Sequence, residues 1–239
     1  MPGSFFVDVH SHVVPAGDDG AGTVGEGRDL CLSAARHGTR LLFATPHVWP
    51  HLTLPRRREE EIRLAYAAVA ARAGLELRLG FELTPIPALL DEDPRRYRLE
   101  GTEFVLMEVP FMGPADDLWA LAEHVERAGL VPVIAHPERT DAVKADPELA
   151  VRLADRGWLL QVNATSLLGR HGDDAEALGW EFLEDDVAAL VASDGHRATR
   201  PPHLDDAYRL AVERLGPDAR RFFDGSALGL DVETAVRAS

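Results

Sequence analysis

The chain has few of the features that mark secreted, membrane or disulfide-linked proteins. Among its 239 residues the single cysteine, Cys31, excludes an internal disulfide framework and a cysteine-based metal site. No apolar run approaches the ~18 residues that a membrane-spanning helix needs. Residues 1–6 lack the basic and apolar regions of a signal peptide, so we expect a cytoplasmic protein with no membrane insertion.

Positive charge is scarce as well. The chain has 25 Lys and Arg residues against 40 Asp and Glu residues, and the formal net charge of −15 argues against nucleic acid as a partner. Such an acidic protein should also repel a phosphate ester. That objection weakens if many of the carboxylates bind divalent cations, because bound cations reverse the sign of the local field.

Short β-rich apolar runs alternate with longer helical segments at a spacing of roughly 30 residues, the rhythm of repeated βαβ units. The runs lie at 5–10, 39–45, 75–82, 104–109, 131–136, 158–163 and 187–194. The expected helices lie at 23–38, 56–73, 116–128, 147–156, 174–184 and 203–215. Seven such units, with no repeat or long linker, predict one closed TIM-like barrel domain over residues 1–239.

An open doubly wound sheet is the alternative to the barrel. It normally carries a glycine-rich phosphate-binding turn after its first strand. This chain has His10-Ser11-His12 at that place instead, which favours the barrel.

Side chains of the kind that bind metals follow six of the seven predicted strands. They are His10, His12, His47, Glu82, Glu108, His136, Asp194 and His196. The carboxyl ends of the strands of a parallel barrel open onto one face, so these side chains should meet at one mouth. Any one of them alone would more often be a packed or ion-paired residue, and only their coincidence at six strand ends predicts a shared site. Mixed imidazole and carboxylate ligands suit manganese, iron or zinc, and several carboxylates allow more than one ion.

The same strand ends carry longer motifs that resemble the PHP superfamily, named for polymerase and histidinol phosphatase. Within it they are most similar to the bacterial capsule and exopolysaccharide tyrosine phosphatases of the CpsB/YwqE type. The motifs are Asp8-Val9-His10-Ser11-His12, Asp18-Asp19-Gly20-Ala21, Ala44-Thr45-Pro46-His47, Ile134-Ala135-His136-Pro137-Glu138-Arg139, Ala192-Ser193-Asp194-Gly195-His196 and Arg200-Pro201-Pro202. They occur in order from Asp8 to Pro202, so the resemblance covers most of the chain.

The resemblance implies a distorted (β/α)7 barrel with three divalent ions, manganese foremost and iron or zinc as alternatives. One ion would be held by His10, His12, Glu82 and Asp194. Glu82 would bridge to a second ion held also by Glu108 and His136, and Asp19, His47 and His196 would hold the third. Arg139 and Arg200 match the arginines that contact the phosphate and serve catalysis in the family.

By the same resemblance, the protein would hydrolyse phosphotyrosine on a bacterial tyrosine autokinase of capsule or exopolysaccharide synthesis, by attack of a metal-bridging hydroxide. A phosphatase of a small phosphoester such as histidinol phosphate is the alternative, and a degenerate barrel without turnover is a third. Three departures from the family pattern, Val48, Thr140 and Arg197, bear on the substrate more than on the metals. The general acid and the oligomeric state stay open.

Two further residues, Cys31 and Trp49, each allow a functional and a structural interpretation. Cys31 cannot belong to the Cys-x5-Arg loop of another phosphatase class, because His37 stands six positions later, and a buried inert thiol is the better interpretation. Trp49 could stack against an aromatic substrate, although plain loop packing accounts for it equally well.

Overall fold

The computed structural model describes residues 5–112 and 115–230, so both ends of the expected 1–239 domain lie outside the described residues. Its strands are β1 (Phe6–Asp8), β2 (Thr39–Ala44), β3 (His47–Val48), β4 (Glu76–Leu79), β5 (Glu82–Leu83), β6 (Phe104–Glu108), β7 (Val131–Ala135), β8 (Leu159–Asn163) and β9 (Leu190–Ala192). Its α-helices are α1 (Val24–Arg36), α2 (Arg56–Ala70), α3 (Asp116–Arg127), α4 (Asp141–Ala145), α5 (Glu148–Asp155), α6 (Ala164–Leu167), α7 (Asp173–Glu184) and α8 (Asp205–Leu215). Short 3₁₀ turns occur at Pro87–Asp91, Pro94–Tyr97, Pro137–Arg139, Pro217–Phe222 and Ser226–Leu228.

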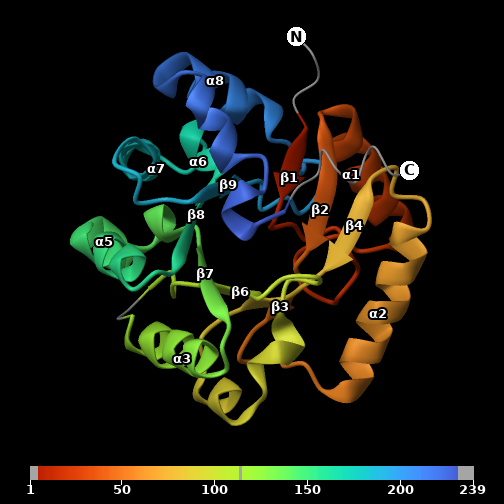
Figure 1. Cartoon of the computed structure of the whole chain (residues 1–239). Coiled ribbons are helices and arrows are strands. Elements are labelled where there is room, and N and C mark those ends of the chain that lie inside the picture. The colour runs from red at the N-terminus through yellow and green to blue at the C-terminus, as the bar shows by residue number, and fades with distance from the viewer. Residues whose placement is uncertain (1–4, 113–114, 231–239) are drawn as a thin grey trace.

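The strands form a distorted barrel, with helices around its outside (Figure 1). All pairings are parallel, in the orders β1-β2-β4 and β3-β5-β6-β7-β8-β9. The chain runs directly from β2 into β3 and from β4 into β5, so these four strands fill two of seven strand positions. Beyond β1 and β9, a parallel bridge joins Ser11 to Gly195. The predicted (β/α)7 barrel is therefore confirmed.

The distortion arises where the second and third strand positions break. Pro46 has no N–H to donate to a ladder, and it separates β2 from β3. At the break between β4 and β5, a Cβ on Gly80 would lie 2.6 Å from Cδ2 of Leu99 and 3.2 Å from its Cα, so a larger residue would force Leu99 to move. The single strand predicted at 75–82 was therefore wrong, and two short strands stand in its place.

The predicted strands also run too far at their carboxyl ends. His136 and Asp194, placed last in two predicted strands, lie beyond β7 and β9, with φ of 36° and 51°. Both values fall in the left-handed region, which non-glycine residues seldom adopt. The backbone thus leaves the sheet at the residues whose side chains the sequence assigned to a metal, and turns them toward the mouth.

Alternation along the strands divides the core into two clusters. Leu42 of β2 packs in the cluster that includes helix residues such as Leu118, whereas Leu41 and Phe43 pack in a second cluster with Leu106. Because successive side chains point to opposite faces of a sheet, the second cluster fills the inside of the barrel. Glu108 of β6 stands two residues after Leu106 of this cluster, so it continues the inward series toward the mouth.

Helix α1 begins as its sequence predicted. Thr23 is the N-cap, and its hydroxyl accepts a hydrogen bond of 3.1 Å from the Glu26 N–H. The Glu26 carboxylate accepts from the Gly22 N–H at 2.8 Å, one residue before the Thr23 N–H that a capping box would use. Over residues 5–112 and 115–230, no helix combines the length and apolarity that a membrane crossing requires.

A close backbone approach fixes α1 against the segment that leads away from His12. A Cβ on Gly27 would lie 2.2 Å from the Val13 carbonyl oxygen, whereas at Gly25 the nearest atom is 3.7 Å away. We expect Gly27→Ala to lower the free energy of unfolding by about 1–3 kcal/mol, because the overpacking outweighs the better helix propensity of alanine.

Gly25→Ala is the matched control in the same helix and should leave stability unchanged or raise it by up to about 1 kcal/mol. Urea denaturation of both variants tests this comparison. Equal stabilities for the two variants would show that the contact between Gly27 and Val13 is not tight.

Candidate metal centre

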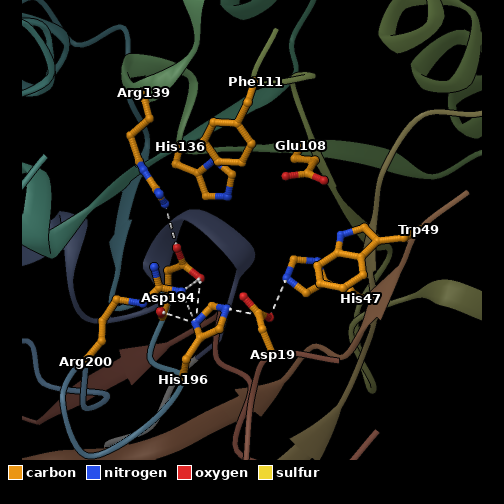
Figure 2. A pocket seen from close by; sticks show the side chains of 10 residues that line it. All are labelled: Asp19, His47, Trp49, Glu108, Phe111, His136, Arg139, Asp194, His196 and Arg200. Carbon is orange, nitrogen blue, oxygen red and sulfur yellow. Dashed lines mark hydrogen bonds and ion pairs between the residues drawn. The ribbon is translucent and has the colours of Figure 1, made fainter. Parts of the chain in front are cut away.

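A cavity of about 200 Å³ opens at the carboxyl ends of the strands (Figure 2). It is lined by Asp19, His47, Trp49, Glu108, Phe111, His136, Arg139, Asp194, His196 and Arg200. Six of these are predicted metal ligands and two are the predicted phosphate-binding arginines. The remaining predicted ligands, His10, His12 and Glu82, are completely buried next to them.

Glu82 lies at the centre of the site. Its Oε2 lies 3.0 Å from His10 Nε2, 3.3 Å from His12 Nε2 and 3.0 Å from His47 Nδ1. Its Oε1 lies 3.0 Å from His136 Nε2. Burial alone would raise the pKa of this carboxyl, but the charges of His10 and His47 hold the pKa well below its usual range. One ionised carboxylate therefore faces four imidazoles.

Asp194 forms the second acidic point of the site. Its Oδ1 lies 3.5 Å from His10 Nε2 and 3.4 Å from both His12 Nε2 and His196 Nδ1. Burial would raise the pKa of Asp194, yet the surrounding imidazoles, of which His10 has the largest effect, keep the pKa well below its usual range. Asp194 and Glu82 thus contact His10 and His12 together.

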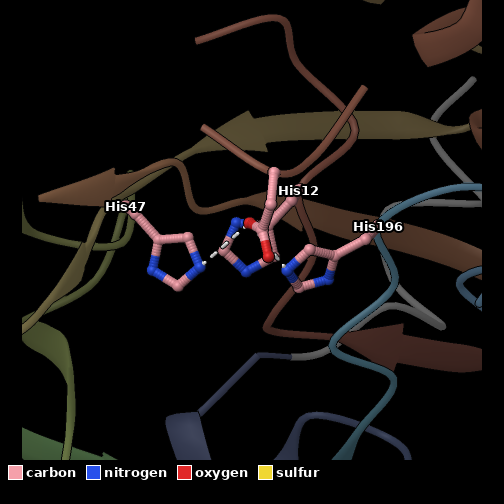
Figure 3. Close-up of side chains that lie close together, drawn as sticks. His12, His47 and His196 are labelled. Carbon is pink, nitrogen blue, oxygen red and sulfur yellow. Dashed lines mark ion pairs between the residues drawn. The ribbon is translucent and has the colours of Figure 1, made fainter. Parts of the chain in front are cut away.

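A third group lies toward the open side of the cavity. Asp19, whose side chain is 58% exposed, places Oδ1 3.5 Å from His47 Nε2 and 3.2 Å from His196 Nε2. His12, His47 and His196 lie next to one another (Figure 3), with the His12 ring centroid 4.2 Å and 4.0 Å from the other two. Because Asp19 is exposed, this group is the one most open to solvent.

The predicted ligand atoms around the cavity fall into three overlapping groups, each spanning no more than 4.8 Å. The groups are His12, Asp19, His47 and His196; His10, Glu82 and His136; and His10, His12 and Asp194. This grouping resembles the three ligand sets that the family pattern implies, with three differences: His12 also joins the Asp19 group, His10 joins Glu82 and His136, and Glu82 is missing from the group of Asp194. Glu108 belongs to none of the three.

Glu108 lines the cavity, but its carboxyl group is hydrogen-bonded to a hydroxyl and not to an imidazole. Its Oε1 accepts a short hydrogen bond from the Thr84 hydroxyl. Burial, reinforced by the charge of Glu82, raises the pKa of Glu108 to about 8. A cation bound beside this carboxyl would lower its pKa again and displace the proton, and the role of Glu108 as a ligand stays a prediction.

The donor atoms fit divalent cations better than they fit one another. His47 Nδ1 and Glu82 Oε2 lie 3.0 Å apart, yet neither atom has a hydrogen-bond partner of acceptable direction among the described residues. His136 Nδ1 and His12 Nδ1 are likewise buried without such a partner. Buried polar atoms are nearly always satisfied. Convergent lone pairs on nitrogen and oxygen are what manganese, iron or zinc would satisfy.

Residues that the sequence left without a role hold two of these side chains in place. Gln161 Oε1 lies 2.8 Å from His10 Nδ1, so Nδ1 carries a proton and the ring turns Nε2 toward Glu82. Asn163 Nδ2 donates to Asp194 Oδ2 at 2.9 Å, and Gln161 Nε2 donates to Asn163 Oδ1 at 2.9 Å. The only signal in the sequence was two amides at alternate positions closing an apolar strand.

Asp18 is a further residue whose role the sequence did not reveal. Its Oδ2 accepts from the His47 N–H at 3.1 Å and lies 3.8 Å from His12 Nδ1. Its Oδ1 accepts from the Gly20 N–H at 3.1 Å. Of the two adjacent aspartates, Asp18 therefore supports the histidines from behind and Asp19 faces the cavity.

Both predicted arginines reach the cavity from the side of Asp194 (Figure 2). Arg139 Nη1 donates to Asp194 Oδ2 at 2.8 Å. Arg200 Nη2 lies 3.7 Å from Asp194 Oδ1 and makes a short contact with His196 Nδ1. Two guanidiniums on one wall of a small cavity are a fitting recognition surface for a phosphoryl group.

Cys31 stands apart from this chemistry. It is buried in α1, and burial raises the pKa of its thiol to about 12, so hardly any thiolate exists near neutral pH. The prediction of a buried, inert thiol agrees with both observations.

Comparison with known proteins places the site in a family. Residues 6–223 match the model of a family described as capsular polysaccharide synthesis, CpsB/CapC. The chain is 30% identical over 227 residues to the tyrosine-protein phosphatase YwqE of Bacillus subtilis (strain 168), covering 89% of this chain and 86% of that protein. It is 27% identical over 232 residues to the tyrosine-protein phosphatase CpsB of Streptococcus agalactiae serotype V, covering 89% and 92%.

A solved structure agrees with these relatives. The fold matches a chain from the crystal structures of YwqE from Bacillus subtilis and CpsB from Streptococcus pneumoniae, described as unique metal-dependent tyrosine phosphatases. The TM-score is 0.78 at 27% sequence identity, and the match covers 90% of this chain and 89% of that one.

The central position of Glu82 leads to a prediction about metal binding. Glu82→Gln keeps the shape of the side chain but removes the charge that faces four imidazoles, so we expect manganese affinity to fall by at least ~100-fold. Metal analysis after dialysis, together with calorimetric titration of the stripped protein, measures this loss. Glu60→Gln, on the exposed face of α2, is the control and should bind manganese normally. Unchanged binding by Glu82→Gln would remove Glu82 from the centre.

Proposed function

We propose that this chain, which belongs to the CpsB/CapC family of capsular polysaccharide synthesis, is a metal-dependent phosphatase acting on phosphotyrosine in proteins. The observation that carries the proposal is the joint placement of buried imidazoles, carboxylates and two guanidiniums around one cavity. The relatives named as tyrosine-protein phosphatases cover most of the chain and support the same conclusion.

The proposal assigns nine side chains to three divalent ions, with manganese foremost and iron or zinc as alternatives. The ligands would be His10, His12, Asp19, His47, Glu82, Glu108, His136, Asp194 and His196. When bound, divalent ions at these residues supply Lewis acidity, which polarises the phosphoryl group and yields a strong nucleophile from water near neutral pH. The overlap of the three geometric groups at His10 and His12 supports ions that lie close together.

Arg139 and Arg200 would bind and orient the phosphoryl group. In the structure both guanidiniums contact Asp194, so each already points into the cavity. A phosphoryl group placed there would accept hydrogen bonds from their N–H groups. The guanidiniums would then stabilise the charge that grows on its equatorial oxygens in the transition state. Asn163 continues to hold Asp194 when the arginines turn toward the substrate.

His136 contributes by staying neutral. Burial lowers the pKa of its imidazole to about 4, so the ring keeps a lone pair available over the whole physiological pH range. Its Nε2 already faces Glu82 Oε1 at 3.0 Å. This is the state that a metal ligand requires.

The proposed substrate is phosphotyrosine on a bacterial tyrosine autokinase of capsule or exopolysaccharide synthesis. The capsular description of the family supports this choice. A tyrosyl leaving group, with a pKa of ~10, requires less protonation than an alkanol, so the reaction depends less on a general acid. Because phosphorylation needs ATP, the proposal also places the protein in the cytoplasm.

Turnover of two phosphate esters tests the proposal. The full chain is stripped of metal, reloaded with manganese, and given a phosphotyrosine peptide or histidinol phosphate. We expect kcat/KM for the peptide to exceed that for histidinol phosphate by at least ~100-fold, with no turnover of either ester in the stripped protein. A preference for histidinol phosphate would be compatible with the proposed metal chemistry but would contradict the proposed substrate. Full activity without metal would contradict the proposed mechanism.

A further inference from the structure

Two aromatic rings stand on the wall of an otherwise charged cavity. Trp49 and Phe111 both line it, beside the carboxylates and guanidiniums (Figure 2). The Trp49 ring stacks on the imidazole of His47, with ring centroids 4.2 Å apart and planes at 27°. The Phe111 ring stacks on His136, with centroids 5.4 Å apart and planes at 16°. Each ring therefore leans on a different proposed metal ligand.

Trp49 is fixed by a tight turn outside the cavity. Its backbone N–H donates to the Leu52 carbonyl at 3.3 Å, and the backbone N–H of Leu52 donates to the Trp49 carbonyl at 3.0 Å. The ring of His51, within the turn, also stacks on Trp49, with centroids 5.4 Å apart. The indole is thus held in position before any substrate arrives, which reduces the entropy lost on binding.

Phe111 is fixed in a different way. Its carbonyl accepts from the Asp141 N–H at 3.1 Å, which attaches it to the start of α4. The Arg139 guanidinium lies over its ring, 5.0 Å from the centroid. Phe111 is nevertheless 42% exposed. Burial of an aromatic side chain is favourable, and contact with water does not stabilise a phenyl ring. An exposed ring beside a recognition site for anions offers a surface for an apolar group attached to that anion.

The cavity has the size that an aromatic group requires. An apolar cavity of about 150 Å³ is enough for a benzene ring. The cavity here measures about 200 Å³, and it is open to solvent on the side of Asp19. The arginines mark the side where the phosphoryl group binds, which leaves the aromatic walls for the ring.

We propose that Trp49 and Phe111 form an aryl subsite, which receives the phenyl ring of the substrate while Arg139 and Arg200 hold its phosphoryl group. The inference rests on the proposed function, and it adds the residues that select an aryl phosphate over an alkyl phosphate. Stacked or edge-on contacts between aromatic rings stabilise a complex beyond the burial of area alone. An aliphatic phosphoester has no aromatic face to offer, so it gains only the anion contacts.

Binding of two phosphonates separates the aryl contribution from catalysis. Phenylphosphonate and methylphosphonate carry the same charged group, and neither contains an ester bond to hydrolyse. Calorimetric titration of the manganese-loaded full chain gives the ratio of their dissociation constants. We expect the parent to bind phenylphosphonate at least ~10-fold more tightly than methylphosphonate. Trp49→Ala and Phe111→Ala should each reduce this preference by roughly 3- to 10-fold, while the affinity for methylphosphonate changes less than about twofold.

Two controls accompany these variants. Trp49→Phe retains an aromatic face and should recover most of the preference, and Leu64→Ala removes an exposed side chain (73%) on α2 and should change nothing. Because both rings stack on proposed ligands, the manganese content of every variant is measured as well. Equal binding of the two phosphonates by the parent would overturn the subsite. So would alanine variants that weaken both phosphonates alike.

The outcome is distinguishable from a failure of the proposed function. If the parent hydrolyses a phosphotyrosine peptide and the variants keep the phosphonate preference, the function stands and the subsite is wrong. If the parent leaves the peptide intact but the alanine variants lose the preference, the subsite stands and the phosphotyrosine substrate is wrong.

Discussion

The buried carboxylate of Glu82, which faces four imidazoles, sets the condition that the surrounding structure must meet. An ionised carboxylate in a protein interior costs several kcal/mol unless opposite charge and hydrogen bonds compensate for it. Here Oε2 has no hydrogen bond of good direction among the described residues, although three imidazole nitrogens lie within 3.3 Å. Such a concentration of donors is stable with cations between them. The parallel bridge between Ser11 and Gly195 closes the barrel next to these strand ends, which holds the donors at these distances.

The same residues that carry the site also close the barrel. The Asp194 N–H donates to the His10 carbonyl at 2.9 Å, and the His12 N–H donates to the Gly195 carbonyl at 2.7 Å. A Cβ on Gly195 would lie 2.6 Å from the nitrogen of Pro202, so the segment that carries Arg200 packs directly on this junction. The position of Arg200, which we propose to bind the phosphoryl group, is thereby linked to the positions of His10, His12 and Asp194. The aromatic rings continue this arrangement outward, since each rests on an imidazole of the site.

The sequence predicted the barrel and the meeting of the proposed ligands because both follow from local pattern. A histidine or acid directly after an apolar run is visible without a structure, and the carboxyl ends of parallel strands share one face. The support from Gln161 was not predictable in this way. It lies 151 positions from His10, and only closure of the barrel brings β8 to bear on that imidazole. Local pattern does not distinguish Asp18 from Asp19 either, because the turn that directs one inward and the other toward the cavity depends on contacts with His47 and His196. Only the family resemblance pointed to Asp19. The stacking of Phe111 on His136 likewise joins the segment that follows β6 to the segment that follows β7.

The central claim is that the imidazoles and carboxylates around Glu82 hold divalent ions. Anomalous diffraction from crystals of the full chain grown with Mn²⁺ tests it most directly, because manganese scatters anomalously and the protein's light atoms hardly do. The account predicts more than one strong anomalous peak in the cavity, with at least one within bonding distance of Glu82 and with His10, His12, His47 and His136 among the neighbours. A cavity without anomalous peaks, in crystals grown at saturating manganese, would contradict it.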